Sequence, residues 1–244
     1  MARGVPAERK IYMARIGKRF RSDLDKAPKE PVPLVEAVNR VRAMKKVKFD
    51  QTIDLVMHLG IDVKQADQQL RGSLSLPHGI GGDPRKVIAF CSPDKVDACL
   101  EAGALKAGGE ELVEEVAGGF MAFDVAVAEP AMMRVVAKLG KALGPKGLMP
   151  SPKAGTVTPD VVTAVKEFAA GKIEYRNDDG GNIHAPIGKQ SFEPEQLSEN
   201  AQAFIDHIVG RKPASSKGTY VKNVSISGTM TPGVPVALAT AESA

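Results

Sequence analysis

The sequence predicts a two-domain protein of α/β and α+β class. An outer α+β domain with a mostly antiparallel sheet is built from both ends of the chain, and an inserted α/β domain carries a parallel, Rossmann-like sheet. Strands near both ends alternate apolar and polar residues, which is typical of antiparallel sheets with one face in water, whereas the middle strands are continuous apolar runs, as in covered parallel sheets. Gly-rich segments separate the two patterns. We expect the outer domain over residues 1–79 and 172–244, and the inserted domain over residues 80–171.

The N-terminal part is expected to begin with two helices. Apolar residues recur at every fourth position between basic ones over residues 7–26, which predicts a cationic amphipathic helix, and a second apolar stripe predicts a helix over 34–46. The period then changes to two over 53–59, which predicts a half-buried strand. We expect a short helix over 62–70 and a short strand over 73–77 to complete this part.

The middle part alternates apolar strands with helices, which favours βαβ units and a parallel sheet. The expected elements are strands at 87–92 and 124–129 and helices at 93–103, 110–117, 130–143 and 158–171, with Thr156 or Thr158 capping the last. The Gly- and Pro-rich segment 144–157 is expected to be a loop. This regular alternation is what distinguishes the middle of the chain from its ends.

The C-terminal part returns to alternating strands. Residues 173–176 and 183–187 alternate apolar and polar side chains, and the NDDGG segment between them predicts a hairpin-type turn. A helix with an apolar face is expected over 197–208, followed by a strand over 223–227. The chain therefore crosses between the domains twice, near Gly79–Gly82 and at Gly171, and these crossings are natural hinges.

The charge distribution points to one basic part. The 244-residue chain has a net charge of +4 from 33 Lys and Arg against 29 Asp and Glu. Residues 1–79 carry 16 basic and 9 acidic side chains, net +7, whereas residues 80–171 carry 10 and 12, net −2, and residues 172–244 carry 7 and 8, net −1. A basic part set against a mildly acidic one favours a polyanionic partner. A solvated basic face is the alternative at this level.

Several classes of protein are not favoured. No apolar run approaches the roughly 18 residues of a membrane span, and the N-terminus lacks the apolar core of a secretory signal. Cys91 and Cys99 are too few for a disulfide framework, which suits a cytoplasmic protein. The phosphate-loop motif is absent, and HGIGGDP precedes its strand, whereas a dinucleotide fingerprint follows one. The four histidines are scattered, so we expect no metal, no cofactor and no catalytic activity.

A first polar segment at the edge of the outer domain is a candidate contact with nucleic acid. Lys48 suits a phosphate, Phe49 suits stacking on a base, and Thr52 suits a 2′-hydroxyl. The alternative is a solvated turn in which Phe49 belongs to the core.

Two further polar segments lie in the C-terminal part. Glu174 and Arg176 share one face of a strand, where a cross-strand ion pair is the alternative. In residues 225–232, small hydroxyl residues surround Gly228, which lets another backbone approach closely, and Met230 offers an adaptable apolar contact. An ordinary C-terminal turn is the alternative there. Two other functions stay open: an α/β enzyme with a nucleotide in the middle domain, and a general basic RNA chaperone.

Four long segments resemble the bacterial ribosomal protein L-one family. They are LGIDVKQADQQLRGSLSLPHGIG, LGKALGPKGLMPSPKAGTV, KIEYRNDDGGNIHAPIGK and KGTYVKNVSISGTMTP. The resemblance implies the inserted-domain architecture and a non-catalytic protein of the cytoplasmic ribosome, monomeric when free and without a membrane partner. It also implies three partners: the stalk region of large-subunit ribosomal RNA beside the exit site, the deacylated tRNA whose release it assists, and its own operon messenger RNA, which it represses.

The resemblance also implies site residues. The RNA-contacting positions that it implies are Lys48, Phe49, Thr52, Lys172, Glu174, Arg176, His184, Lys189, Ser227, Gly228, Thr229 and Met230. The hinge positions expected from the two Gly-rich crossings, independently of the resemblance, are Gly79, Gly81, Gly82 and Gly171. The chain departs from the family's usual Ser-Thr-Met-Gly-Pro, since Gly228 and Thr231 stand at the Ser and Gly positions. Because Thr231 carries a Cβ, a main-chain contact that Gly permits is altered there.

Overall fold

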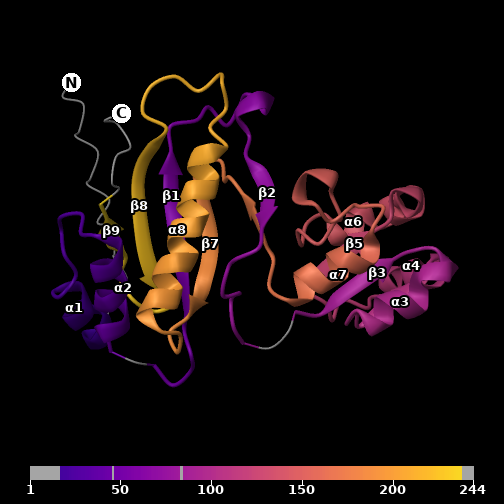
Figure 1. The fold of residues 1–244 in the computed structure, drawn as a ribbon, viewed down its shortest axis with the longest axis horizontal. Helices are drawn as coiled ribbons and strands as arrows, with labels where there is room; N and C mark the ends of the chain where they lie inside the picture. The colour runs from indigo at the N-terminus through magenta and orange to yellow at the C-terminus, as the bar shows by residue number, and fades with distance from the viewer. Residues whose placement is uncertain (1–16, 46, 83–84, 238–244) are drawn as a thin grey trace, which may run out of the picture.

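A computed structural model describes residues 17–45, 47–82 and 85–237 (Figure 1). The expected helix over residues 7–26 lies partly outside these ranges, and its described part is the helix α1, Lys18–Leu24. The second expected helix is α2, Leu34–Ala43, which begins directly after Pro33 and ends three residues earlier than expected. Among the described residues, no helix combines the length and apolarity needed to cross a bilayer.

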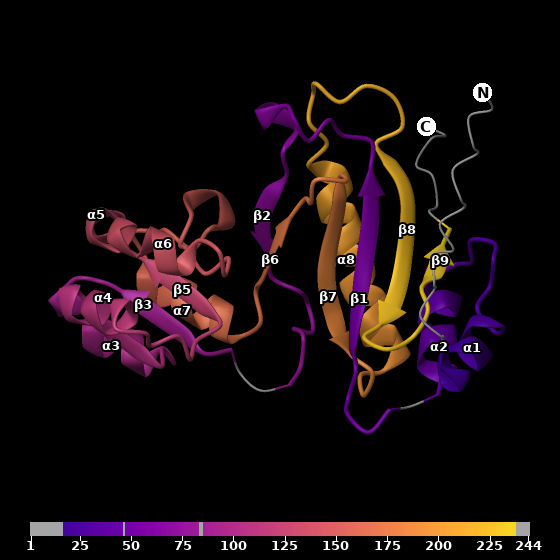
Figure 2. The same cartoon turned by 180° about the vertical axis from the view of Figure 1, so that it is seen from behind.

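The outer domain is a four-stranded antiparallel sheet with the order β7-β1-β8-β9. Its strands are β1 (Thr52–Leu59), β7 (Asn182–Lys189), β8 (Val221–Gly228) and β9 (Val234–Val236). Every second residue of β1 is buried, so the alternation read from the sequence gives one apolar face. The helices α2 and α8 (Pro194–Gly210) cover that face and leave the other face open (Figure 2). This confirms the fold class expected for the outer domain.

The NDDGG segment forms the expected hairpin-type turn, in which the Asp178 N–H donates to the Asn182 carbonyl at 2.8 Å, but the strands on its two sides do not pair along their length. Strand β6 (Ile173–Arg176) pairs with β2 (Arg71–Leu74), whereas β7 pairs with β1, and a single bridge joins Asn177 to Ile183. Tyr175 of β6 is buried, and its ring meets the Phe204 ring of α8 edge-on at 5.8 Å between centroids. The β2–β6 ribbon stands beside the main sheet (Figure 1).

The inserted domain contains the parallel sheet that the continuous apolar runs predict. Strands β3 (Val87–Phe90), β4 (Lys106–Gly108) and β5 (Val125–Ala128) have the order β4-β3-β5, and all four residues of β3 are buried. The helix α3 (Val96–Glu101) connects β3 to β4, α4 (Glu110–Ala117) connects β4 to β5, and α7 (Val161–Ala169) follows β5 and packs on the same sheet. Separate apolar clusters cover the two faces of this sheet, as a parallel sheet requires.

Three local expectations for helices are wrong. The continuous helix expected over 130–143 is broken into short turns of 3-10 and α-helix, of which α5 (Met133–Val136) and α6 (Gly140–Leu143) are the α-helical ones. Gly140, a poor helix former, begins the last of them. Neither threonine caps α7, because the Asp160 carboxylate accepts from the Thr163 N–H at 3.2 Å. The helix expected over 62–70 shrinks to one 3-10 turn, Ala66–Gln68.

The apolar cores divide along the expected boundary. The core of the outer domain draws its residues from positions up to Ile80 and from Ile173 onward, and the two clusters of the inserted domain lie between Val87 and Ala169. On this division we retain the proposal of an outer domain over 1–79 and 172–244 and an inserted domain over 80–171.

The two crossings lie side by side. Gly79, Gly81, Gly82 and Gly171 all have positive φ. A side chain at Gly81 would collide with the Phe192 ring at 2.4 Å, and one at Gly171 would meet the main chain of Ile80 at 3.4 Å. Glycine is therefore required for the path of both linkers.

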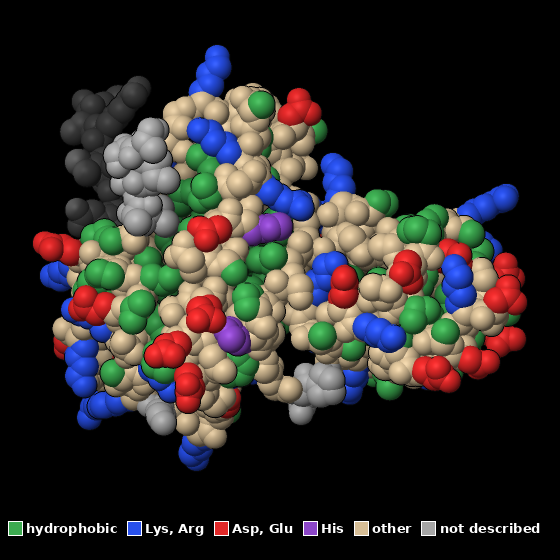
Figure 3. All heavy atoms as spheres, in the orientation of Figure 1, with side chains coloured by type: hydrophobic (Ala, Val, Ile, Leu, Met, Phe, Trp, Pro, Cys, Tyr) green, Lys and Arg blue, Asp and Glu red, His purple; other side chains and the backbone are tan. Residues whose placement is uncertain are grey.

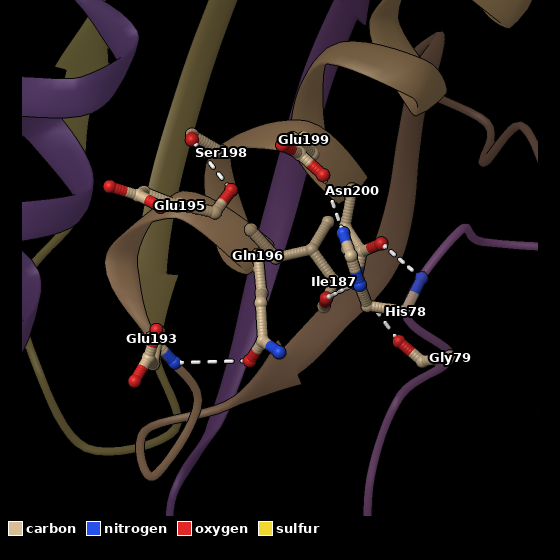
Figure 4. A network of polar contacts seen from close by, with 9 residues as sticks. All are labelled: His78, Gly79, Ile187, Glu193, Glu195, Gln196, Ser198, Glu199 and Asn200. Atoms are coloured by element: carbon tan, nitrogen blue, oxygen red, sulfur yellow. Dashed lines mark hydrogen bonds and ion pairs between the residues drawn. The ribbon is translucent and has the colours of Figure 1, made fainter.

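The first linker is fastened to α8 at its start (Figure 4). The Asn200 side chain accepts from the His78 N–H at 3.1 Å and donates to the carbonyls of Gly79 at 2.9 Å and Ile187 at 2.8 Å. His78 also pairs with Glu199. Because these bonds fasten the linker as far as Gly79, we propose that the hinge pivots at residues that follow Gly79.

Candidate nucleic-acid interface

The open face of the outer sheet is lined by polar side chains. On β1, Asp54, Val56 and His58 alternate with the buried residues and therefore lie on the face opposite to the core. Their cross-strand neighbours on the same face are Ser227, Ser225 and Asn223 on β8 and Pro186, His184 and Asn182 on β7. The face thus presents hydroxyl, amide and imidazole groups in ordered rows. Such groups bind nucleic acid through hydrogen bonds, whereas a surface of Lys and Arg would bind it mainly through attraction to the phosphates.

One acidic side chain interrupts this face. Burial raises the pKa of the Asp54 carboxyl, and the nearby His184 and Lys189 partly offset that rise. An acidic group beside a lysine ammonium, as Asp54 is beside Lys189, repels a phosphate less than an isolated carboxylate does. Asp54 is therefore compatible with a polyanion on this face.

The structure brings together the residues expected at the start of β1, the end of β7 and the end of β8. The Lys189 ammonium donates to the Thr52 hydroxyl at 2.9 Å. The Thr52 carbonyl accepts from the Thr229 N–H at 3.0 Å and from the Thr229 hydroxyl at 3.2 Å. Residues that are more than 170 positions apart in the chain thus form one polar group at the end of the sheet.

Phe49 is not a core residue. Its side chain is 52% exposed, and it precedes β1 at the same end of the sheet, next to the exposed Lys48. The turn below it is fixed, because the Asp50 carboxylate accepts from the N–H of Ser191 at 3.1 Å and from its hydroxyl at 2.7 Å. An exposed aromatic ring on a fixed turn beside a cation is the arrangement that stacks on a base.

The C-terminal turn meets this group from β8. Gly228 ends the strand, and Thr229 and Met230 are exposed, the Met230 side chain by 49%. The turn is closed by Thr231, whose N–H donates to the Gly228 carbonyl at 3.0 Å. It therefore projects one hydroxyl and one thioether beside the Phe49 segment.

The candidates on the β2–β6 ribbon stand apart from this group. Glu174 pairs with Arg71 at 2.7 Å across the ribbon. The alternative of a cross-strand ion pair is therefore correct for Glu174, but its partner is Arg71 and not Arg176. Lys172 pairs with Glu167 of α7 at 2.7 Å. Arg176 is exposed. His184 belongs to β7 of the main sheet and not to the ribbon, and its imidazole lies 3.7 Å from the Asp178 carboxylate. Of these, Arg176 and His184 are the side chains most available to a ligand.

Several residues of this region carry no signal in the sequence. Gln51 and Gln190 join their side chains at 3.1 Å beneath the C-terminal turn, and Arg19 of α1 donates to the Met230 carbonyl at 2.9 Å. A cleft of about 520 Å³ runs from Thr52 to Arg85 of the inserted domain. Long-range contacts bring these residues in, so no local pattern could have found them.

The inserted domain shows no comparable surface for nucleic acid at its far end. Acidic side chains gather there over α3 and α4 (Figure 3). The residues are Asp94, Asp97, Glu101, Glu110, Glu111, Glu114 and Glu115. A polyanion would be repelled by this end of the molecule.

The carboxyl ends of the parallel strands, where nucleotides bind in many α/β proteins, are occupied by protein side chains. Glu129 accepts from the Lys95 ammonium at 2.9 Å and from the Ser92 hydroxyl at 2.8 Å, and these bonds lower the pKa of its carboxyl. Burial raises the pKa of the Cys91 thiol to about 12, so this thiol is not a nucleophile at neutral pH. Within the described ranges, no three His, Cys, Asp or Glu residues are grouped to hold a metal ion.

Fold and surface together define the class: a two-domain protein whose outer antiparallel sheet carries a polar surface at its open face and end. The sequence model of the family described as "Ribosomal protein L1p/L10e family" matches residues 41–232. The chain is 48% identical over 220 residues to a large ribosomal subunit protein uL1 of Clavibacter michiganensis subsp. michiganensis, covering 90% of this chain and 96% of the relative. It is 49% identical over 225 residues to that of Saccharophagus degradans, covering 92% and 97%.

The chain belongs to the ribosomal protein L1p/L10e family. The resemblance read from the four sequence segments is thereby confirmed, and so is a structural role in the large ribosomal subunit. The expected location, the cytoplasmic ribosome, agrees with these bacterial relatives.

Proposed function

We propose that the chain binds the stalk region of large-subunit ribosomal RNA through the open face and end of its outer sheet. In this position, beside the exit site, it assists the release of deacylated tRNA, and it represses translation of its own operon messenger RNA by binding a copy of the same RNA shape. It acts without catalysis and is a monomer when free. The observation that carries the proposal is the joining of Phe49, Thr52, Lys189 and Thr229 into one surface group within a ribosomal family.

The residues of the proposed RNA-binding surface have distinct roles. Lys48, Lys189 and Arg176 contact phosphates, and the exposed ring of Phe49 stacks on a base. Thr52, Thr229 and the serines of β8 reach 2′-hydroxyls, which distinguish RNA from DNA. Inward bonds already hold Lys172 and Glu174, which frame the β6 side of the surface.

Competition binding tests the proposal. A transcript of the stalk region is titrated with the protein at fixed salt, in the presence of excess random RNA duplex of equal length. We expect the stalk transcript to stay bound, whereas equal competition by the random duplex would indicate a general basic RNA chaperone, whose binding depends on counterion release alone. Gradient fractionation of cell extract should find the protein with the large ribosomal subunit.

Thr229→Val and Lys48→Gln should separate hydroxyl contacts from phosphate contacts. We expect Thr229→Val to cost about 1 kcal/mol, roughly fivefold in affinity, since a desolvated hydroxyl contact is lost. Lys48→Gln should cost less at moderate salt and reduce the slope of log K against log salt by about 0.7 to 0.9, because one fewer counterion is released. Filter binding over a salt series measures both. If Thr229→Val leaves the affinity unchanged, Thr229 does not contact the RNA.

A further inference from the structure

The main chain of the C-terminal turn is engaged inside the protein. Its four N–H groups have these acceptors: Thr231 Oγ1 for Gly228 at 2.8 Å, the Thr52 carbonyl for Thr229 at 3.0 Å, Gln51 Oε1 for Met230 at 2.9 Å, and the Gly228 carbonyl for Thr231 at 3.0 Å. The Met230 carbonyl accepts from Arg19. A ligand that approaches the turn therefore meets the side chains of Thr229 and Met230 before any free N–H group.

Gln51 holds the turn from below. Its side chain is 1% exposed, accepts from the Met230 N–H and donates to Gln190 Oε1 at 3.1 Å. Gln190 in turn donates through its own N–H to the Gln51 carbonyl at 2.8 Å and through its side chain to the carbonyl of Arg42 in α2 at 3.4 Å. This series of bonds ties Met230 to the end of the helix α2.

Thr231 holds the turn from within. Its hydroxyl accepts from the Gly228 N–H and donates back to the Gly228 carbonyl at 3.4 Å. A Cβ on Gly228 would stand 3.1 Å from that hydroxyl oxygen, which is tighter than ordinary contact. The absence of a side chain at Gly228 therefore leaves room for the Thr231 hydroxyl to bond the main chain of Gly228.

We propose that Gln51 and Thr231 are positioning residues, which fix the C-terminal turn so that the side chains of Thr229 and Met230, and not its main-chain N–H groups, contact the RNA. The inference rests on the proposed function, because it names how one part of that surface acts. A turn that is already ordered loses little conformational entropy on binding, so the network raises affinity without itself touching the ligand.

Gln51→Ala tests this role, with Gln202→Ala as the matched control. Gln202 is an exposed glutamine on α8 whose side chain bonds only Asp206 among the described residues. We expect Gln51→Ala to lower affinity for the stalk transcript about three- to tenfold, since it leaves the Met230 N–H without its partner. In the free protein, hydrogen exchange at the Met230 amide should become faster, and Gln202→Ala should change neither measurement.

Thr231 provides a second test that keeps the fold. Thr231→Val removes the hydroxyl at nearly constant volume, whereas Thr231→Ser retains it. We expect faster exchange at the Gly228 amide and weaker RNA binding for Thr231→Val, with both measurements restored by Thr231→Ser. If Thr231 served only the stability of the fold, the affinity for RNA would not depend on whether residue 231 carries a hydroxyl.

Two outcomes would overturn the inference. One is faster exchange at the Met230 amide with unchanged affinity, and the other is unchanged exchange in both Gln51→Ala and Thr231→Val. Failure of the proposed function is recognised separately, because the unaltered protein would then not prefer the stalk transcript, whereas the exchange measurements need no RNA.

Discussion

Phe49→Ala is expected to weaken binding of the stalk transcript by about 1–3 kcal/mol, roughly 5- to 150-fold, while the stability of the protein changes little. The ring is 52% exposed, so its removal takes few contacts from the folded state. It stands on the turn fixed by Asp50 and Ser191, so its orientation is set before the RNA arrives. The affinity loss therefore reports the lost stacking.

Leu105→Ala is the matched control for the Phe49 experiment. Leu105 is 46% exposed and lies in the inserted domain, directly before β4. Both variants are compared by filter binding and by thermal unfolding. An unchanged affinity for Phe49→Ala would mean that the ring does not stack on a base, and that the surface binds through hydroxyl and phosphate contacts alone.

Asn200→Ala is expected to destabilise the outer domain by about 2–3 kcal/mol. Asn200 is fully buried, and its side chain makes three hydrogen bonds, to His78, Gly79 and Ile187. The Ile187 carbonyl loses its amide partner, and the first linker loses its attachment to α8 (Figure 4). A buried polar group left without a partner is the costly part of such a change.

Urea unfolding followed by tyrosine fluorescence measures this loss. The chain has no Trp, and its three tyrosines all lie in residues 1–79 and 172–244, so the signal reports the outer domain. Hydrogen exchange at the His78 amide should become faster in the same variant. Gln202→Ala on the same helix serves as control, and an equal effect of both substitutions would contradict a specific role for Asn200 at the linker.

Local patterns were sufficient for most elements of the fold. The period-two alternation of β1 and the unbroken apolar run of β3 report how many faces of each strand are covered, which separates an antiparallel sheet from a parallel one. The patterns failed where partners from distant parts of the chain decide. Strand β6 pairs with β2, and its Tyr175 packs on Phe204, and no feature of the NDDGG turn could indicate either contact.

The charge and motif patterns likewise placed the functional surface only in part. The +7 balance of residues 1–79 pointed to a polyanion, and the four family segments pointed to the ribosome. The polar segment from Lys48 to Thr52 was visible, but its partners were not. Lys189 and Thr229 reach Thr52 because strands from three parts of the chain end at the same edge of the sheet.

The sequence by itself determined the family, the two sheet types and the polar segments, because each is written in residues that are close together in the chain. Only the tertiary structure decided which side of the C-terminal turn faces outward. Thr231 departs from the family's usual Gly, and in the fold its hydroxyl closes the turn on Gly228 while Gln51 holds Met230. The bond from Met230 to Gln51 joins residues 179 positions apart and depends on the packing of the whole outer domain, and such a contact leaves no periodicity in the sequence.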